Sequence, residues 1–292
     1  MVTRPFESKI QDIVYNVDVG IGLRLIKLGL YLLFLLSVMV LYTATQFRGL
    51  KDAQAMDVAQ LGRNLMQSGQ YVTSVIRPAS MWYLIEHSAA QNPHMRQHPD
   101  ILHPPVYPVL LATGFKLLEG AFLEDKGART FPPEQWVVIP VNLIFTVVTG
   151  ILVYLMARRL FDQRVAQLSM TLFFLSDAVW SLAITGTGAS VAVAWCALAT
   201  YAALLAATPP AEGAARWPAW LALAFCALFS ALAFLTRYST VILVPALALY
   251  LAWSARQRKG LVLAVYAGLF AVFITPWLVR NYVHFDNFRI TE

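Results

Sequence analysis

Charged residues and cysteines are both scarce in this chain of 292 residues. Only 13% of its residues are charged and 59% are hydrophobic, whereas soluble domains carry about 25% charged and about 45–50% apolar residues. This deficit of charge excludes an ordinary soluble domain and predicts a polytopic membrane protein. The two cysteines, Cys196 and Cys226, lie inside apolar runs, so neither a disulfide framework nor a cysteine metal site is predicted.

The basic residues do not cluster in a way that indicates a nucleic-acid partner. The formal net charge is +6, but Lys and Arg are scattered between apolar runs without a basic stripe or a recognition motif. The sequence also lacks internal repeats and low-complexity tracts. We therefore predict no nucleic-acid binding and interpret the basic residues as determinants of membrane topology.

Seven apolar runs predict membrane-spanning helices, each of which needs about 20 predominantly apolar residues. They cover residues 28–45, 136–156, 165–184, 187–207, 217–235, 239–254 and 261–279. A long polar leader precedes the first run, which favours an uncleaved anchor over a signal peptide. The predicted fold class is therefore an all-α polytopic membrane protein. Its expected parts are a cytoplasmic leader (1–27), a first transmembrane helix (28–45), an outer or periplasmic loop (46–135), a six-helix bundle (136–279) and an outer tail (280–292) that precedes a further C-terminal part.

An eighth apolar run, residues 105–118, is short and follows two prolines. If this run does not cross the membrane, the short basic turns all fall on one face, which is cytoplasmic under the positive-inside rule. These turns contain Arg158 and Arg159, Arg216, and residues 256–259. We therefore predict a helix over 104–120 that lies in the membrane interface, with Tyr107 and Lys116 at headgroup level.

The same outer loop contains a second predicted amphipathic helix, from Ala53 to Met66. Val58 and Leu61 share one face of this helix, and Asp57 and Asn64 share the opposite face. The loop thus combines two interfacial helices with most of the histidines of the chain. A large polar loop held against apolar helices is typical of an enzyme whose substrate is anchored in lipid.

The order of these features resembles the GT-C superfamily of polytopic glycosyltransferases. One span is followed by a loop that opens with Asp52, then by an amphipathic segment, and then by His-Pro-Pro-Val-Tyr-Pro at 103–108. The closest branch is the protein O-mannosyltransferase and lipid A aminoarabinose transferase type. Later stretches that resemble the family are Arg158-Arg159-Leu160-Phe161, residues 233–237 and residues 276–282. The chain departs from the pattern at Ala53, where the family often has Glu.

The resemblance implies transfer of a sugar from a polyprenyl-phosphate donor to a glycolipid, polysaccharide or protein acceptor. It implies inversion and an active site at the periplasmic face of the bacterial inner membrane. Asp52 matches the family position of the general base, which takes the proton of the acceptor hydroxyl. Asp52 also precedes a predicted helix and would make a good N-cap, which is its alternative role. Asp57 is the second catalytic candidate, with a solvated surface charge as its alternative.

Three residues are candidates to bind the donor phosphate. Arg237 interrupts an apolar stretch at the outer surface, and a guanidinium is suited to bidentate phosphate contact, although a snorkelling role is the alternative. Arg77 is a weaker candidate of the same kind. His103 could touch the phosphate, orient the acceptor, or serve only as a turn residue.

Tyr107, Asp177 and Arg280 are candidates for an acceptor or secondary site. Asp177 lies in an apolar run, where an ionisable group indicates function unless a neighbouring helix pairs with it. No metal or other cofactor is predicted, because His94 and His98 lack an evident third ligand.

Two other functions stay open from the sequence. A transporter or flippase for a lipid-linked substrate would show broken helices in paired positions and repeat symmetry, which are not visible. A non-catalytic membrane subunit could have kept the scaffold and lost the chemistry. An Asp52→Asn variant separates an enzyme that uses Asp52 from such a subunit.

Overall fold

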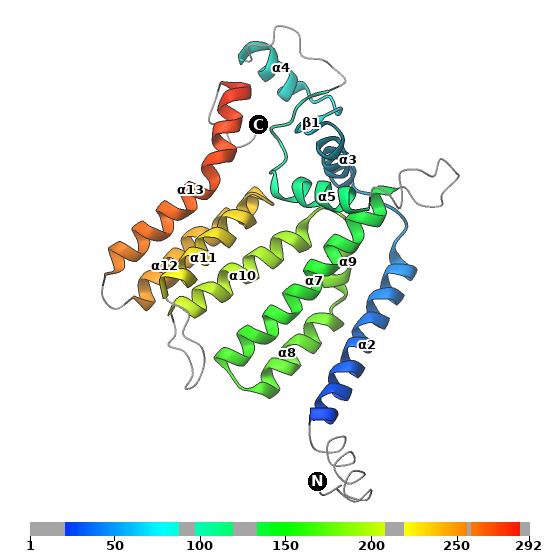
Figure 1. The fold of residues 1–292 in the computed structure, drawn as a ribbon, viewed down its shortest axis with the longest axis vertical. Coiled ribbons are helices and arrows are strands. Elements are labelled where there is room, and N and C mark those ends of the chain that lie inside the picture. The colour runs from blue at the N-terminus through cyan, green and yellow to red at the C-terminus, as the bar shows by residue number, and fades with distance from the viewer. Residues whose placement is uncertain (1–20, 88–96, 119–132, 208–218, 256–257, 287–292) are drawn as a thin grey trace, which may run out of the picture. The chain divides into compact units, whose positions relative to one another are not determined.

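The computed structural model describes residues 21–87, 97–118, 133–207, 219–255 and 258–286. Most of the predicted leader (1–20) and the last residues of the predicted tail (287–292) lie outside the described residues, as does His94. The chain divides into two compact units, residues 1–47 and 48–292. Figure 1 draws both units as ribbons and labels most of their helices.

The first unit contains one described helix, α2 (Ile21–Gln46). Its segment Gly29–Gln46 is apolar enough to cross a membrane. Within this segment the hydroxyls of Ser37 and Thr45 donate to the carbonyl oxygens of Leu33 and Leu41, one turn earlier. These bonds satisfy polar groups that lipid cannot hydrate, which is how a spanning helix tolerates Ser and Thr.

The second unit begins with the polar loop, in which α3 (Ala53–Ser68) packs against α5 (Val106–Leu117). The buried face of α3 includes Val58 and Leu61, as the amphipathic pattern predicts. Gly62 permits the close approach, because a Cβ there would lie 2.9 Å from Cβ of Leu111. Both helices predicted in the loop are therefore present, and they pack against each other.

A short antiparallel pair joins the two halves of the loop. Strand β1 (Val72–Thr73) pairs with β2 (His98–Pro99), and Val72 lies opposite Pro99. Helix α4 (Pro78–His87) follows β1 and packs on the end of the last helix through Met81, Leu84, Ile101 and Phe285. The pairing brings the residue after β2, Asp100, beside the residue before β1, Tyr71.

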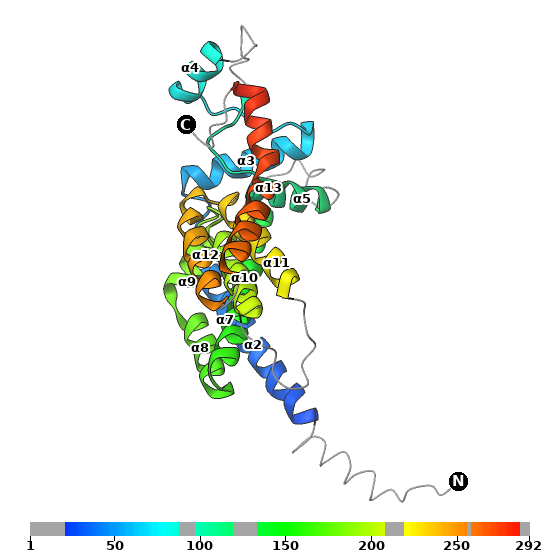
Figure 2. The same cartoon turned by 90° about the vertical axis from the view of Figure 1, so that its left-hand side faces the viewer.

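The rest of the second unit is a helical bundle (Figures 1 and 2). Its elements in chain order are α7 (Pro133–Leu160), α8 (Gln163–Leu175), α9 (Asp177–Ile184), α10 (Ala189–Ala207), α11 (Ala219–Phe234), the 3₁₀ helix η1 (Tyr238–Ile242), α12 (Leu243–Ser254) and α13 (Lys259–Phe285). Helix α10 packs against α7 and α11 through a surface rich in buried alanines. Small residues allow such close helix contacts in membranes. In the core, the hydroxyl of Tyr266 donates to Oγ of Ser230 over 2.9 Å.

The predicted count of seven spans is not confirmed. Among the described residues, four helices are long and apolar enough to cross a membrane, or five if the bent pair α8 and α9 forms one span. This pair is bent by 53° because Ser176 is extended and ends α8. Helix α11 has only 16 residues, about 24 Å of helix, which is short of the roughly 30 Å hydrocarbon core. Arg237, also extended, separates α11 from η1 and α12.

Tyr107 does not face lipid headgroups, contrary to its predicted interfacial role, because the protein covers its side chain. Tyr107 is buried, and its hydroxyl donates to the carbonyl oxygen of Gly186 and accepts from Nδ2 of Asn142. The turn between α9 and α10 lies against its ring, because a Cβ on Gly188 would lie 2.5 Å from Cδ1 of Tyr107. Gly188 has a φ of +74°, which also favours glycine. Tyr107 therefore connects α5 to the bundle.

Candidate active site

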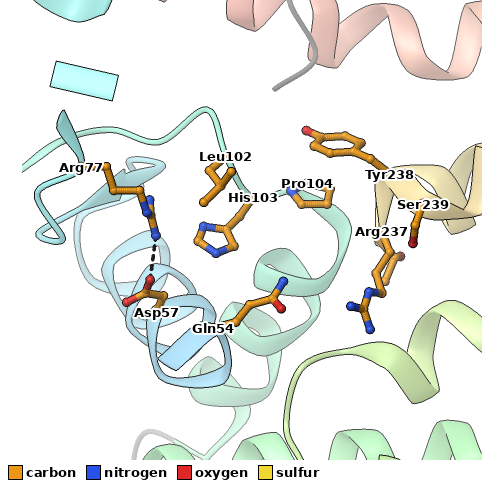
Figure 3. Close-up of a pocket in the computed structure, with 10 residues that line it drawn as sticks. Gln54, Asp57, Arg77, Leu102, His103, Pro104, Arg237, Tyr238 and Ser239 are labelled. Atoms are coloured by element: carbon orange, nitrogen blue, oxygen red, sulfur yellow. Dashed lines mark hydrogen bonds and ion pairs between the residues drawn. The ribbon is translucent and has the colours of Figure 1, made fainter. Parts of the chain in front are cut away.

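A pocket of about 420 Å³ lies where α3, the His103-Pro104 turn and the η1 segment meet (Figure 3). Its lining comes from segments that lie far apart in the chain. The lining residues are Gln54, Asp57, Arg77, Leu102, His103, Pro104, Thr236, Arg237, Tyr238 and Ser239. Figure 3 shows Arg77 and Asp57 on one side of His103, and Arg237 and Tyr238 on the other.

One wall of the pocket contains Asp57, Arg77 and His103, and ion pairs and hydrogen bonds connect it to Asp100, which is not itself a lining residue. Nη2 of Arg77 donates to Oδ2 of Asp57 over 2.6 Å, and its Nη1 donates to Oδ1 of Asp100 over 2.9 Å. The other carboxylate oxygen of Asp100 accepts from the backbone N–H of His103 over 2.8 Å and lies 3.1 Å from Nδ1 of the same residue. Four side chains from α3, the start of α4 and the loop after β2 thus form one network. We call it the acidic wall: Asp57, Arg77, Asp100 and His103.

Asp100 is the most buried member of the acidic wall, with a side chain only 1% exposed. Burial by itself would raise the pKa of Asp100, but the hydrogen bonds from His103 and the charge of Arg77 oppose it and hold the pKa below its ordinary value. The carboxylate form is therefore favoured. A buried carboxylate of this kind is stabilised only while its partners stay in place.

The opposite wall is formed by residues 236–239, at the break between α11 and η1. Arg237 lies in this wall, and no ion pair to it exists within the described ranges. Tyr238 stands beside it, and its hydroxyl accepts a hydrogen bond from Nε1 of Trp277 over 3.0 Å. We call this segment the basic wall, because it contributes a guanidinium and three hydroxyl-bearing residues, Thr236, Tyr238 and Ser239, to the lining of the pocket.

Arg280 holds the loop to the end of α13. Its Nη1 donates to the backbone carbonyl oxygen of Asp100 over 2.7 Å, and its Nη2 donates to that of Tyr71 over 3.2 Å. The guanidinium carbon lies 4.9 to 5.5 Å from the ring centres of Trp277, Tyr71 and Phe285. Arg280 is therefore a structural tie behind the acidic wall and does not line the pocket.

Tyr71 holds the His-Pro-Pro turn through a hydrogen bond. Its hydroxyl donates to the carbonyl oxygen of His103 over 2.9 Å. Burial, and after it the charge of Asp100, raises the pKa of Tyr71 well above its ordinary value of 10.0. The hydroxyl consequently keeps its proton and its bond to the turn.

The structure brings together four of the eight residues that the sequence predicts for the site: Asp57, Arg77, His103 and Arg237. Asp52 is the N-cap of α3, and its Oδ1 accepts from the N–H of Gln54 over 2.8 Å. It is exposed and is not a lining residue, although Gln54 is. Asp177 is exposed at the first position of α9, and Tyr107 is buried in the bundle.

Asp100 and Tyr238 were not predicted. Asp100 follows a proline in a polar stretch, where an acidic residue indicates a turn, and only the pairing of β1 with β2 brings it to Arg77. A signal for Tyr238 was present, because it directly follows Arg237. Within the described ranges, no group of three or more His, Cys, Asp or Glu side chains is placed to hold a metal ion.

Comparison with known protein families identifies the family of this chain. Residues 102–279, more than half of the sequence, match the dolichyl-phosphate-mannose-protein mannosyltransferase family. The chain belongs to this family. The family is of the GT-C type, so the resemblance predicted from the sequence is confirmed, and the protein is a multi-pass membrane protein of a glycosyltransferase family. No curated protein and no solved structure matches the chain.

The residues that match the family model include only part of the pocket lining. His103, Pro104 and the basic wall lie inside the matched residues, whereas Asp52, Asp57 and Arg77 precede them. Membership in the family implies a lipid-linked sugar donor and an acceptor in a general sense.

Proposed function

We propose that this member of the mannosyltransferase family transfers a sugar from a polyprenyl-phosphate donor to an acceptor hydroxyl in the pocket of Figure 3. The single observation that carries the proposal is the meeting of Arg237 with the acidic wall in one pocket of about 420 Å³. Such a pocket offers an anion-binding group on one side and hydrogen-bond acceptors on the other. Both are needed when a phosphate leaves and a hydroxyl attacks.

The donor phosphate binds to the basic wall in this proposal. The charge of Arg237 is not neutralised by an ion pair among the described residues, so it is available for an anionic ligand. Tyr238 and Ser239 line the same wall, and their hydroxyls can donate further bonds to a ligand. Arg77, in contrast, is already bound by two carboxylates, which makes it a poor partner for a phosphate.

Asp52 is the proposed general base. Its Oδ1 accepts from one backbone N–H, and the exposed residue precedes by two positions Gln54, which lines the pocket. Asp57 lies in the pocket itself, but its carboxylate is bound by Arg77 at 2.6 Å. This ion pair occupies an oxygen that would otherwise be open to the acceptor hydroxyl. The proposed reaction proceeds with inversion, because the hydroxyl attacks from the face opposite the leaving phosphate.

The outer, periplasmic face of a bacterial inner membrane is the proposed location of the pocket. Lys259 begins α13, and Arg280, the tie to the acidic wall, lies near the other end of that helix, about 30 Å away along its axis. Arg158 and Arg159 end α7, whose first turns lie toward α5 and Tyr107. Under the positive-inside rule, the ends with these basic residues are cytoplasmic, which supports an outer pocket.

The experiment is transfer of label from radiolabelled polyprenyl-phosphate sugars into endogenous acceptors of isolated membranes. Asp52→Asn is compared with Asp162→Asn, because Asp162 is the N-cap of α8 and accepts from the N–H of Val165 over 2.8 Å. Asn is as good an N-cap as Asp, so both variants keep their helices. We expect Asp52→Asn to lower the rate by about 10²–10⁴-fold and Asp162→Asn to leave it unchanged. Full activity in Asp52→Asn would exclude Asp52 as the base, and no transfer by the wild type with any donor would count against the function itself.

A further inference from the structure

Asp100 is at the centre of the acidic wall, and the proposed reaction assigns it no role. One oxygen of its carboxylate holds Arg77, and the other holds both the backbone and the ring of His103. Its own backbone carbonyl oxygen accepts from Arg280, and its N–H donates to the carbonyl oxygen of Tyr71 over 3.3 Å. The residue is thus fixed on all sides, and it fixes in turn two of the side chains that line the pocket.

The bond to the His103 ring has a chemical consequence. A carboxylate can only accept hydrogen bonds, so the ring nitrogen that faces Asp100, Nδ1, must carry a proton. In a neutral imidazole the second nitrogen, Nε2, then carries a lone pair. His103 is 4% exposed and lines the pocket, so this lone pair can serve only a group that enters the pocket.

A lone pair repels a phosphate oxygen and accepts a hydrogen bond from a hydroxyl. Arg237, across the pocket, has the opposite preference. The two walls therefore differ in the kind of ligand atom that each one favours.

We infer that Asp100 is a positioning residue that sets His103 to accept a hydrogen bond from an O–H or N–H group of the acceptor next to the attacking hydroxyl, whose own proton goes to Asp52, and that His103 does not bind the donor phosphate. The inference rests on the proposed function and assigns the acidic wall to the acceptor. Asp100 acts through two partners, because it also keeps Arg77 away from the donor by holding it against Asp57. The acceptor is then held at the acidic wall while the phosphate is held at the basic wall.

The first test is spectroscopic and does not depend on activity. The protein is labelled with ¹⁵N in its histidine rings and placed in lipid nanodiscs, and His103 is assigned among the five histidines with a His103→Asn variant. We expect the wild type to show a protonated Nδ1 and an unprotonated Nε2 at His103. Asp100→Asn should shift the ring toward the other tautomer or a mixture of the two. A wild-type ring protonated at Nε2 alone would overturn the inference.

The second test separates the donor from the acceptor. Binding of undecaprenyl phosphate to the purified protein is measured beside the rate of transfer. His103→Asn keeps a donor near the position of Nδ1 and deletes Nε2. We expect Asp100→Asn and His103→Asn to lower transfer about tenfold or more and to change the Kd for undecaprenyl phosphate less than about twofold. Asp162→Asn is the control for replacing a carboxylate by an amide.

Each result has a distinct meaning. If His103→Asn weakens undecaprenyl phosphate binding about tenfold, His103 belongs to the donor site and the inference is wrong. If Asp100→Asn transfers sugar at the wild-type rate, Asp100 does not position a residue that the reaction needs. If the wild type transfers no sugar at all, the proposed function fails, while the tautomer of His103 still reports whether Asp100 sets the ring.

Discussion

Arg77 joins two carboxylates that lie 43 residues apart, since it donates to Asp57 over 2.6 Å and to Asp100 over 2.9 Å. The guanidinium is therefore neutralised from both sides, and its 17% exposure leaves little room for a ligand. Across the same pocket Arg237 has no such partner among the residues that the structure describes. The two arginines that the sequence suggests as phosphate ligands, Arg237 first and Arg77 second, thus have different surroundings and different expected roles.

Replacing Arg237 tests the basic wall. Arg237→Gln should raise the KM for the lipid-linked donor by roughly 10–100-fold, because a hydrogen bond to a charged group contributes about 1.5–3 kcal/mol. Arg237→Lys should retain part of the affinity, since it keeps the charge and loses the planar fork. Donor titrations of the transfer rate measure the effect. An unchanged donor KM in Arg237→Gln would remove Arg237 from the donor site.

Replacing Asp57 tests whether the carboxylate inside the pocket is a base or a partner of Arg77. Asp57→Asn keeps the shape of the side chain and removes the charge that holds Arg77. We expect a loss of activity of roughly tenfold, far smaller than that of Asp52→Asn, because a misplaced arginine impairs the site without removing the base. The two variants are compared by initial rates in the same membranes. Equal losses in both would move the role of general base toward Asp57.

The turn before α10 should tolerate no side chain at Gly188. A Cβ there would lie 2.5 Å from Cδ1 of Tyr107, in a backbone conformation with φ of +74°. Gly188→Ala should lower the free energy of unfolding by about 1–2 kcal/mol for the conformation and by about 1–3 kcal/mol more for the overlap. Gly268→Ala is the control, because a Cβ added at Gly268 would meet no neighbouring side chain or helix within 4 Å. Thermal unfolding in detergent measures both, and equal midpoints would contradict the packing described for Tyr107.

Lowering the pH should reduce the stability of the folded loop, and part of this reduction should depend on Asp100. Burial would raise the pKa of Asp100, but His103 and Arg77 hold it below the ordinary value of 3.8. The stabilisation from Asp100 is therefore complete above about pH 4 and is lost as the pH falls through the lowered pKa. Burial also lowers the pKa of His98 from 6.5, although Asp100 opposes this shift, so His98 contributes a loss of stability that begins at higher pH.

The two contributions can be separated with Asp100→Asn. The midpoint temperature of thermal unfolding of the wild type should decrease as the pH is lowered from about 7 to about 3. The variant should lack the part of this decrease that occurs below about pH 4. Thermal unfolding across this range supplies the measurement. A variant that follows the wild-type curve throughout would show that Asp100 is not ionised in the folded loop.

Local patterns were sufficient to predict much of the loop. The helical spacing of apolar and polar residues from Ala53 predicts α3, and the two prolines before Val106 predict the start of α5. The candidates His103 and Arg237 were predicted from residue type and position, and the structure brings them into one pocket. These features depend on short segments, so the sequence alone contains their signal.

Features that depend on distant contacts were not predicted. Asp100 reaches Arg77 only through the pairing of Val72 with Pro99, which a polar, proline-containing stretch does not indicate. Tyrosine is a residue type that is common at membrane interfaces, yet Tyr107 is buried against Asn142 and the turn at Gly186. The run 165–184 contains no Gly or Pro to indicate a break, although Ser176 followed by Asp177 is a typical start of a new helix.

The bend at Ser176 is secured by a side chain. In a continuous helix the carbonyl oxygen of Phe174 would accept from the N–H four residues later, whereas here Nε1 of Trp180 donates to it over 2.7 Å. Straightening this segment would break the indole bond before a backbone bond could replace it, and lipid offers no water to compensate. The indole of Trp180 consequently opposes straightening of the bend between α8 and α9.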